Sequence, residues 1–426
     1  MAAGFLGLSL VCVVGGLSPR GVHAQVITLA ELERQAVRSR PALDANDAAA
    51  RGAQSDVDRA LAGYYPSVSL EGKTSLSPGN ELRDLPSDDG YVVSATKQDL
   101  GVEAFRPVVR YGVGVEARMN VYDFGRTSAT VDASRAKRSA VQANRDVTRL
   151  QIVRGVRASY LGWLGAYELL SVTERAAADA QERSGRVAAL ISEGMRPKAD
   201  LTPVRSDELL AQLELERARG DVEKRKLVLE HAIGAPLPAS AVPDRTLLDQ
   251  PAGDDKQEDP ELHALLLERT AAQKAAEALD QSDNATLGAL GSVGMYGQTK
   301  YPFPNYSVGI GLSVPLWDGG ADDASAAAAR ARSDGISAQI REHELAKEQE
   351  KRVVTIDTHN ANKRLEMAQA LLASTTVQLA EAEARYDLGG GGIEPIAVAR
   401  AMMRRAHTEL LLAKVARVEA ALRALP

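Results

Sequence analysis

The chain has 426 residues, with 4 % aromatic side chains and a formal net charge of −6. This composition, rich in Ala, Leu, Arg and Glu, is typical of long helices that meet along thin apolar seams. The modest charge and the lack of dense Lys/Arg clusters near aromatic residues argue against nucleic-acid binding.

Residues 1–24 are expected to form a secretory signal peptide. An apolar stretch is followed by Val22-His23-Ala24, a small-residue cleavage pattern that precedes Gln25. The only cysteine, Cys12, lies inside this segment, so the mature chain is expected to lack disulfides and thiol chemistry. No later stretch holds the ~18 uninterrupted apolar residues typical of a membrane-spanning helix. A mature chain that enters a membrane is therefore expected to do so as a β-barrel.

The sequence contains an internal duplication. Residues 111–125 align without gaps with residues 306–320, and residues 68–72 align with residues 287–291. The two alignments differ in offset because the first half carries an insertion of about 24 residues rich in Ser, Pro, Asp and Gly, which indicates a long loop. Each half is predicted to contain a short helix, two strands and a long helical hairpin.

The two repeats are expected at 25–233 and 261–426, joined by a linker at 234–260 that is rich in Pro, Ala and Asp. The predicted strands are at about 65–76, 107–121, 286–298 and 305–316. Long proline-free stretches with apolar residues at coiled-coil spacing predict helical hairpins at about 123–233 and 318–425.

Apolar residues alternate with mostly Gly or polar residues in 111–121 and 306–316, so each predicted strand has one apolar face and one polar face. Each run is close to the 9–11 residues that a tilted strand needs to cross a bilayer. A soluble sheet with one face on a core is the alternative, but the rest of the chain offers little apolar surface to cover it. Four strands cannot close a barrel alone, so copies must share it: two would give eight strands and three would give twelve.

Short motifs recur at the ends of these elements. They are Arg40-Pro41-Ala42-Leu43, Tyr65-Pro66-Ser67-Val68, Tyr122-Asp123-Phe124-Gly125-Arg126, Leu316-Trp317-Asp318-Gly319-Gly320, Glu193-Gly194-Met195, Ala199-Asp200-Leu201 and Tyr386-Asp387-Leu388-Gly389. In order, duplication and spacing, over nearly the whole mature chain, these motifs resemble the TolC-like outer-membrane efflux family.

The resemblance implies an α+β membrane protein, a homotrimer in which four strands per protomer form one twelve-stranded β-barrel, continued by a periplasmic α-helical coiled-coil tunnel. It implies a passive channel of the outer membrane that extends into the periplasm. The implied partners are a periplasmic adaptor protein and an inner-membrane efflux pump or type I secretion transporter. The alternative is a periplasmic coiled-coil adaptor, although adaptors typically have one hairpin whereas this chain has two hairpins and two strand pairs.

The resemblance also implies site residues. The hairpin tips, which would meet an adaptor and form the periplasmic aperture, hold Gly194, Met195, Asp200, Gly389 and Gly390. Asp200 is expected either to line the aperture or to cap the return helix. Pro395 and Val398 stand where the family usually carries Asp or Glu, so a double carboxylate ring is not expected here.

Two further groups of candidates lie in or next to the strands. Glu116 and Arg118 face the expected barrel lumen and are predicted to pair across strands. Asp123 with Gly125, and Asp318 with Gly320, mark the junctions from strand to helix, where the aspartates are expected to cap the long helices.

No catalytic constellation is recognisable, so the chain is not expected to be an enzyme. The histidines are scattered, and His343-Glu344 lacks a second histidine four residues on, so no metalloprotease motif exists. Residues 389–392 lack the preceding strand and the Lys-Ser/Thr of a phosphate-binding loop. Neither a metal nor a cofactor is expected.

Overall fold

The computed structural model describes residues 25–78, 107–249, 259–298, 301–388 and 392–423. The expected signal peptide at 1–24, most of the insertion in the first repeat, and residues 250–258 of the expected linker lie outside this part of the chain. The chain divides into two compact units, here called the tip unit (Met1–Ser39, Gly155–Pro251, Arg364–Glu419) and the sheet unit (Arg40–Arg154, Ala252–Lys363, Ala420–Pro426).

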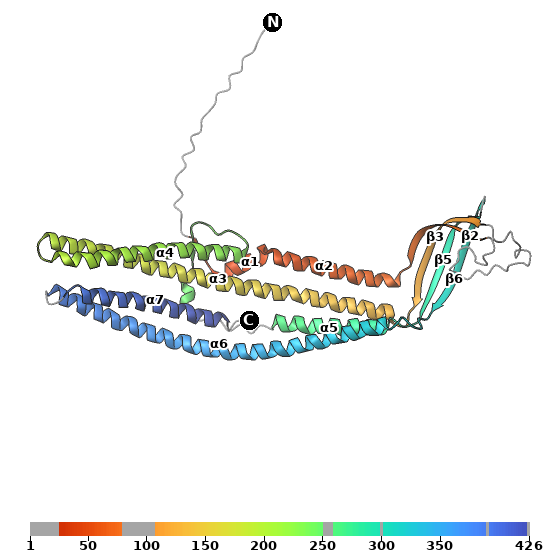
Figure 1. Ribbon diagram of the computed structural model, residues 1–426. Coiled ribbons are helices and arrows are strands. Elements are labelled where there is room, and N and C mark those ends of the chain that lie inside the picture. Colours follow the sequence, from red (N-terminus) through yellow and green to blue (C-terminus); the bar gives the residue numbers. More distant parts are fainter. Residues whose placement is uncertain (1–24, 79–106, 250–258, 299–300, 389–391, 424–426) are drawn as a thin grey trace, which may run out of the picture. The chain divides into compact units, whose positions relative to one another are not determined.

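The sheet unit combines helices with four long strands. Its elements are α2 (Pro41–Leu61), β2 (Ser67–Pro78), β3 (Pro107–Tyr122), the first part of α3 (Arg126–Ser192), α5 (Pro260–Asp280), β5 (Thr286–Gln298), β6 (Tyr301–Ser313) and the first part of α6 (Ala321–Asp387). Helix α2 lies beside the first part of α3, and α5 beside the first part of α6 (Figure 1). The apolar contact between α5 and α6 is thin, with Ala272 against Ile336 and Ile340.

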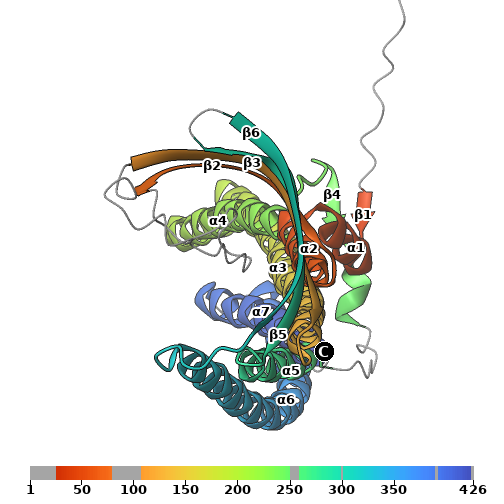
Figure 2. The ribbon, with the colours of Figure 1, turned by 90° about the vertical axis from the view of Figure 1, so that its right-hand side faces the viewer.

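The four strands form one antiparallel sheet in the order β2-β3-β5-β6. The central pair, β3 and β5, joins the two repeats. The strands make a single curved layer (Figure 2). Within the described residues β2 and β6 each have one neighbour, so both edges of the sheet offer unpaired backbone groups.

The observed strand limits lie close to the expected ones for every strand but the last. The last strand, expected at about 305–316, runs from Tyr301 to Ser313. It ends there because Ser313 pairs with Thr286, the first residue of β5, so no partner backbone continues. Pro315, which lacks an N–H, also follows within two residues.

The described residues of the tip unit are almost entirely helical. Its elements are β1 (Gln25–Ile27), α1 (Leu29–Ser39), the rest of α3, α4 (Leu201–Ile233), β4 (Ala241–Pro243), the rest of α6, and α7 (Glu394–Arg423). Its largest fully buried side chains are Trp163, Tyr160, Leu32, Leu164, Leu229, Ile233 and Val156. Further along α3 and α4 the contact is made by alanines, which let the two helices approach closely.

Part of the expected linker is folded. Strand β4 pairs in parallel with β1, and the buried hydroxyl of Tyr160 holds the pair against α3. This hydroxyl donates to Ile27 O at 3.0 Å and accepts from Asp244 N at 2.8 Å. The Pro- and Ala-rich composition of residues 234–260 gave no sign of this pairing, because a three-residue strand is too short to show alternation.

The long helices α3 and α6 have 67 residues each. At ~1.5 Å per residue, each is about 100 Å long. The equal lengths reflect the duplication in the sequence. Among the helices of the described residues, none is both long and apolar enough to cross a membrane.

Candidate functional site

The sheet has one apolar face that is open to solvent in the single chain. A row across all four strands shows it: Leu70 pairs with Val115, Val115 with Val293, and Val293 with Tyr306. These side chains are 74 %, 42 %, 61 % and 75 % exposed. The same face carries the exposed residues Val68, Leu76, Val113, Met119, Met295, Val308, Ile310 and Leu312. Apolar exposure of this extent marks a surface that is covered in the working molecule.

The opposite face of the sheet is polar. The next row holds Ser69, Glu116, Ser292 and Ser307 in consecutive pairs, and the hydroxyls of Ser292 and Ser307 are hydrogen-bonded at 2.9 Å. On this face the ring of Tyr296 covers Gly112, where a Cβ would lie 2.3 Å from a ring carbon. One face of the same strands therefore suits an apolar surrounding, and the other suits water.

Glu116 and Arg118 both lie on this polar face, but they form an ion pair with each other along β3. A pair of either residue across strands stays a prediction. The positions directly opposite Glu116 are Ser69 and Ser292, so neither neighbouring strand offers a charge there. Residues two apart on one strand share a face, and these long side chains can reach each other.

Asp123 organises the junction between β3 and α3. Its carboxylate accepts hydrogen bonds from Thr127 N at 2.8 Å, Gly125 N at 3.2 Å and Asn120 Nδ2 at 2.8 Å. Gly125 adopts φ +98°, a conformation that favours glycine. Burial alone would raise the pKa of Asp123, but the hydrogen bonds from Thr127 and Asn120 hold it below its usual value. The side chain is therefore an anionic cap of α3.

Asp318 plays the same part between β6 and α6. It accepts hydrogen bonds from Gly320 N at 2.8 Å and from Asp322 N at 2.7 Å, which lower its pKa. Gly320 adopts φ +84°. In both repeats, an aspartate three residues before the helix and a glycine one residue before it make the turn.

At the first hairpin tip, in the tip unit, Gly194 ends α3 in a left-handed conformation (φ +75°). Gly194 N donates to Ile191 O and Met195 N donates to Leu190 O, a pairing typical of a glycine helix end. Met195 follows with 60 % of its surface exposed. Gly389 and Gly390, the candidates of the second tip, lie outside the described residues.

Asp200 does not cap the return helix with its side chain. The residue is the last of a 3-10 turn at Lys198–Asp200, and its helical backbone (φ −69°, ψ −18°) leads directly into α4 without a side-chain hydrogen bond. A capping side chain needs an extended backbone at its own residue, and the 3-10 turn removes it. The half-buried carboxylate therefore remains a candidate for the aperture.

Contacts between the two hairpins were missed by sequence reasoning. Arg196 donates from Nη2 to Tyr386 O at 2.9 Å, and its guanidinium lies 3.8 Å from the centre of the Tyr386 ring. Asp207 of α4 forms an ion pair with Arg404 of α7 and, within the first hairpin, with Arg183 of α3, each at 3.2 Å. These partners are far apart in sequence, so no local pattern connects them.

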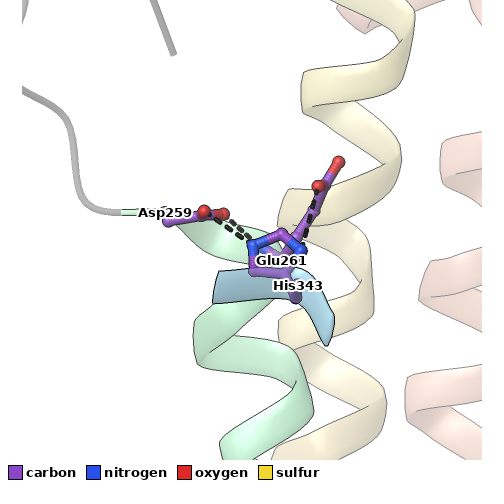
Figure 3. Close-up of side chains that lie close together, drawn as sticks. All are labelled: Asp259, Glu261 and His343. Carbon is purple, nitrogen blue, oxygen red and sulfur yellow. Dashed lines mark hydrogen bonds and ion pairs between the residues drawn. The ribbon is translucent and has the colours of Figure 1, made fainter. Parts of the chain in front are cut away.

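Two groups of side chains in the described residues bring ligand atoms for a cation within 4.8 Å of one another: Asp259 with Glu261 and His343, and Asp283 with Asp318 and Asp322. In the second group, both Asp318 oxygens accept backbone hydrogen bonds at the helix start, which leaves them less available to bind a cation. The first group combines an imidazole with two carboxylates (Figure 3).

A two-faced strand layer and two long helical hairpins, arranged as a duplicated unit, define the class of outer-membrane efflux proteins. The family model for the outer membrane efflux protein matches residues 32–235 and 254–425. The chain belongs to this family. No curated protein matches the chain in sequence.

Solved structures share the fold at low sequence identity. CusC, in a study of transmembrane channel formation, matches with a TM-score of 0.76 and 16 % identity, over 93 % of this chain and 90 % of that one. The CmeC outer membrane channel of Campylobacter jejuni matches at 0.71 and 15 %, over 93 % and 84 %. The outer membrane protein VceC of Vibrio cholerae matches at 0.72 and 16 %, over 92 % and 94 %. At these identities the likeness is one of fold.

Proposed function

We propose that the protein is a passive exit duct of the outer membrane in a tripartite efflux system. Three copies would close one barrel of twelve strands, with the apolar faces toward lipid and the polar faces toward a water-filled lumen. The single observation that carries the proposal is the apolar row of Leu70, Val115, Val293 and Tyr306 beside the polar row that begins at Ser69. The open edges at β2 and β6 support sharing, because lipid does not tolerate unpaired strand edges.

We further propose that the helical hairpins of three copies form a periplasmic tunnel whose tips close its end. The contacts of Arg196 with Tyr386 and of Asp207 with Arg404 support a state in which the two hairpins of one chain are held together. Asp200 would add one carboxylate per copy at the aperture. Transport would be driven by a partner, and the duct itself would perform no chemistry.

A periplasmic adaptor is the proposed partner, and it would hand over substrate from an inner-membrane pump. In the tip unit, a groove of about 500 Å³ runs between α6 and α7, lined in part by Met367, Leu371 and Met402. Met367 and Met402 are 70 % and 50 % exposed. Flexible, apolar methionines suit the face of an amphipathic partner helix.

Planar bilayer recordings test the proposal. Purified protein, without a partner or nucleotide, is expected to give discrete conductance steps. Asp200→Asn is expected to weaken block by divalent cations if the carboxylate lines the aperture. Absence of conductance, together with recovery of the protein in the soluble periplasm without detergent, would contradict the proposal.

A further inference from the structure

His343 of α6 lies between two carboxylates at the start of α5, all in the sheet unit (Figure 3). Its Nε2 is 2.8 Å from Asp259 Oδ2, and its Nδ1 is 4.0 Å from Glu261 Oε2. The side chains of His343 and Glu261 are 16 % and 26 % exposed, so the cluster is sheltered but reachable by water. The channel function proposed above assigns no role to this cluster.

Asp259 fixes the orientation of the imidazole. One of its oxygens, Oδ1, accepts hydrogen bonds from the N–H groups of Glu261 and Leu262 and so caps α5. The other, Oδ2, accepts from His343 Nε2. Both oxygens of Asp259 therefore accept hydrogen bonds, as those of a carboxylate do. With the proton on Nε2, a neutral imidazole presents a lone pair at Nδ1.

Glu261 turns one oxygen toward this lone pair. Its Oε1 accepts a hydrogen bond from Arg154 Nη1 at 3.2 Å, and its Oε2 lies 4.0 Å from His343 Nδ1. That distance is too long for a hydrogen bond. Two ligands of a tetrahedral zinc ion lie about 3.4 Å apart, since Zn–N and Zn–O bonds are each about 2.1 Å, so a side-chain shift of roughly 0.6 Å would let one ion bridge the two atoms.

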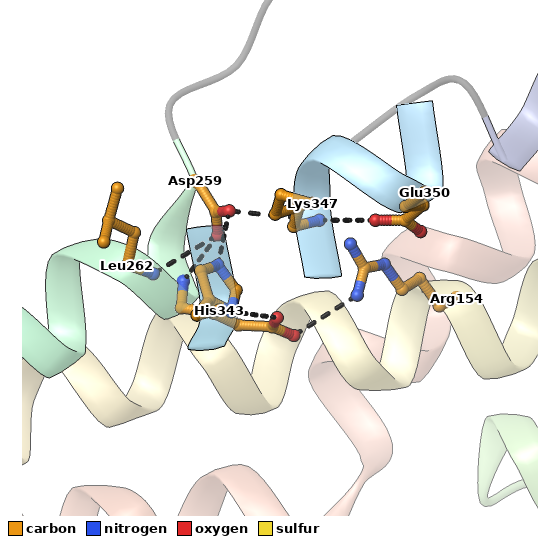
Figure 4. Close-up of polar contacts among 7 residues, drawn as sticks. Arg154, Asp259, Leu262, His343, Lys347 and Glu350 are labelled. Carbon is orange, nitrogen blue, oxygen red and sulfur yellow. Dashed lines mark hydrogen bonds and ion pairs between the residues drawn. The ribbon is translucent and has the colours of Figure 1, made fainter. Parts of the chain in front are cut away.

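The nearby cation Lys347 has a closer partner elsewhere (Figure 4). Its Nζ lies 3.9 Å from Asp259 Oδ2 but 3.0 Å from Glu350 Oε2. Lys347 therefore does not fill the gap between His343 and Glu261. Arg154 occupies only the far oxygen of Glu261 and orients this carboxylate.

We propose that His343 Nδ1 and Glu261 Oε2 bind a divalent transition-metal ion such as Zn²⁺, with water in the remaining positions. Asp259 and Arg154 act as outer partners, in the way that a carboxylate commonly holds the second nitrogen of a metal-bound histidine. An imidazole with a carboxylate suits Zn²⁺ better than Mg²⁺ or Ca²⁺, which prefer oxygen ligands alone. The ion would tie the start of α5 to α6.

Isothermal titration of ZnCl₂ into the EDTA-treated, detergent-solubilised full-length protein tests the site. We expect saturable binding of one ion per chain. His343→Gln and Glu261→Gln should each weaken binding at least tenfold, and Asp259→Asn about tenfold, because loss of an outer partner typically costs 10–100-fold in affinity. His359→Gln, an exposed histidine of the same helix, is the matched control and should bind as the wild type does.

His343→Lys separates metal binding from a simple ion pair. Lysine places a positive charge between the carboxylates but offers no lone pair at neutral pH. We expect this variant to melt near the wild-type temperature without zinc, and to lose the rise in melting temperature that zinc gives the wild type by binding the folded state. No saturable zinc binding to the wild type, or binding of equal strength in well-folded His343→Gln or His343→Lys, would overturn the proposal.

Discussion

At the residue scale, aspartates set the backbone at both junctions from strand to helix. Asp123 and Asp318 make equivalent hydrogen bonds in the two repeats, and Gly125 and Gly320 supply the positive φ that follows. These four residues could be found from the sequence because a cap and a glycine turn depend on local geometry. The lack of a cap from the Asp200 side chain could not be found in this way, since it depends on a 3-10 turn.

Replacement of Asp123 by alanine should destabilise the protein by about 0.5–2 kcal/mol through loss of the cap. The pKa of Asp123 is lower in the folded protein than its usual value. Its carboxylate therefore stabilises the fold above about pH 4, and this contribution is lost as the pH falls through the folded-state pKa. Thermal unfolding at pH 7 and at pH 3.5 measures this, and the difference between wild type and variant should shrink at the lower pH. Asp132→Ala, a change in an exposed side chain of α3, is the control.

Tyr160→Phe should cost about 1–2 kcal/mol, because it removes the two hydrogen bonds of the Tyr160 hydroxyl and leaves Asp244 N and Ile27 O with only their longer bond to each other at 3.3 Å. Burial raises the pKa of Tyr160 to about 12. The stabilisation by its protonated hydroxyl is thus complete below pH 10 and is lost as the pH rises toward 12. Tyr167→Phe keeps the ring that lies 5.3 Å from the Arg245 guanidinium, and should change little. Equal melting temperatures for Tyr160→Phe and wild type would contradict this role.

At the scale of elements, the sequence predicted those strands and helices whose residues show a regular apolar pattern. The apolar alternation of β3 and β6 and the long proline-free helices follow from local patterns. The pairing of β1 with β4 and the contact of Arg196 with Tyr386 depend on the tertiary fold.

The two faces of β2 give a matched pair of substitutions. Leu70→Arg places a charge on the face proposed to meet lipid, where arginine costs about 2–4 kcal/mol near the bilayer midplane. Ser69→Arg places the same charge one residue away on the polar face. We expect Leu70→Arg alone to reduce the assembled protein in the outer-membrane fraction, measured by fractionation and semi-native gels. Equal losses for both variants would argue against a lipid-facing side.

The contact between hairpins predicts an effect on closure. Arg196→Ala removes one hydrogen bond and one cation–π contact, together about 1–2 kcal/mol. The open probability in bilayer recordings should rise several-fold, and Arg196→Lys should restore closure only in part. Arg186→Ala, which removes an exposed pair within α3, serves as the control and should leave gating unchanged.

At the scale of the whole molecule, a single copy neither covers the apolar face of its sheet nor pairs the two edge strands. Within the described residues, the apolar face is uncovered and β2 and β6 are open edges. The strand count alone is compatible with a barrel of two or three copies, and the family resemblance favours three. Closure of one barrel by several copies is therefore the central claim.

Native mass spectrometry of the protein released from detergent micelles tests this claim most directly. The account predicts a mass of three mature chains, retained at collision energies that strip the detergent. A monomer as the sole species, under conditions in which the protein is folded by circular dichroism, would contradict it.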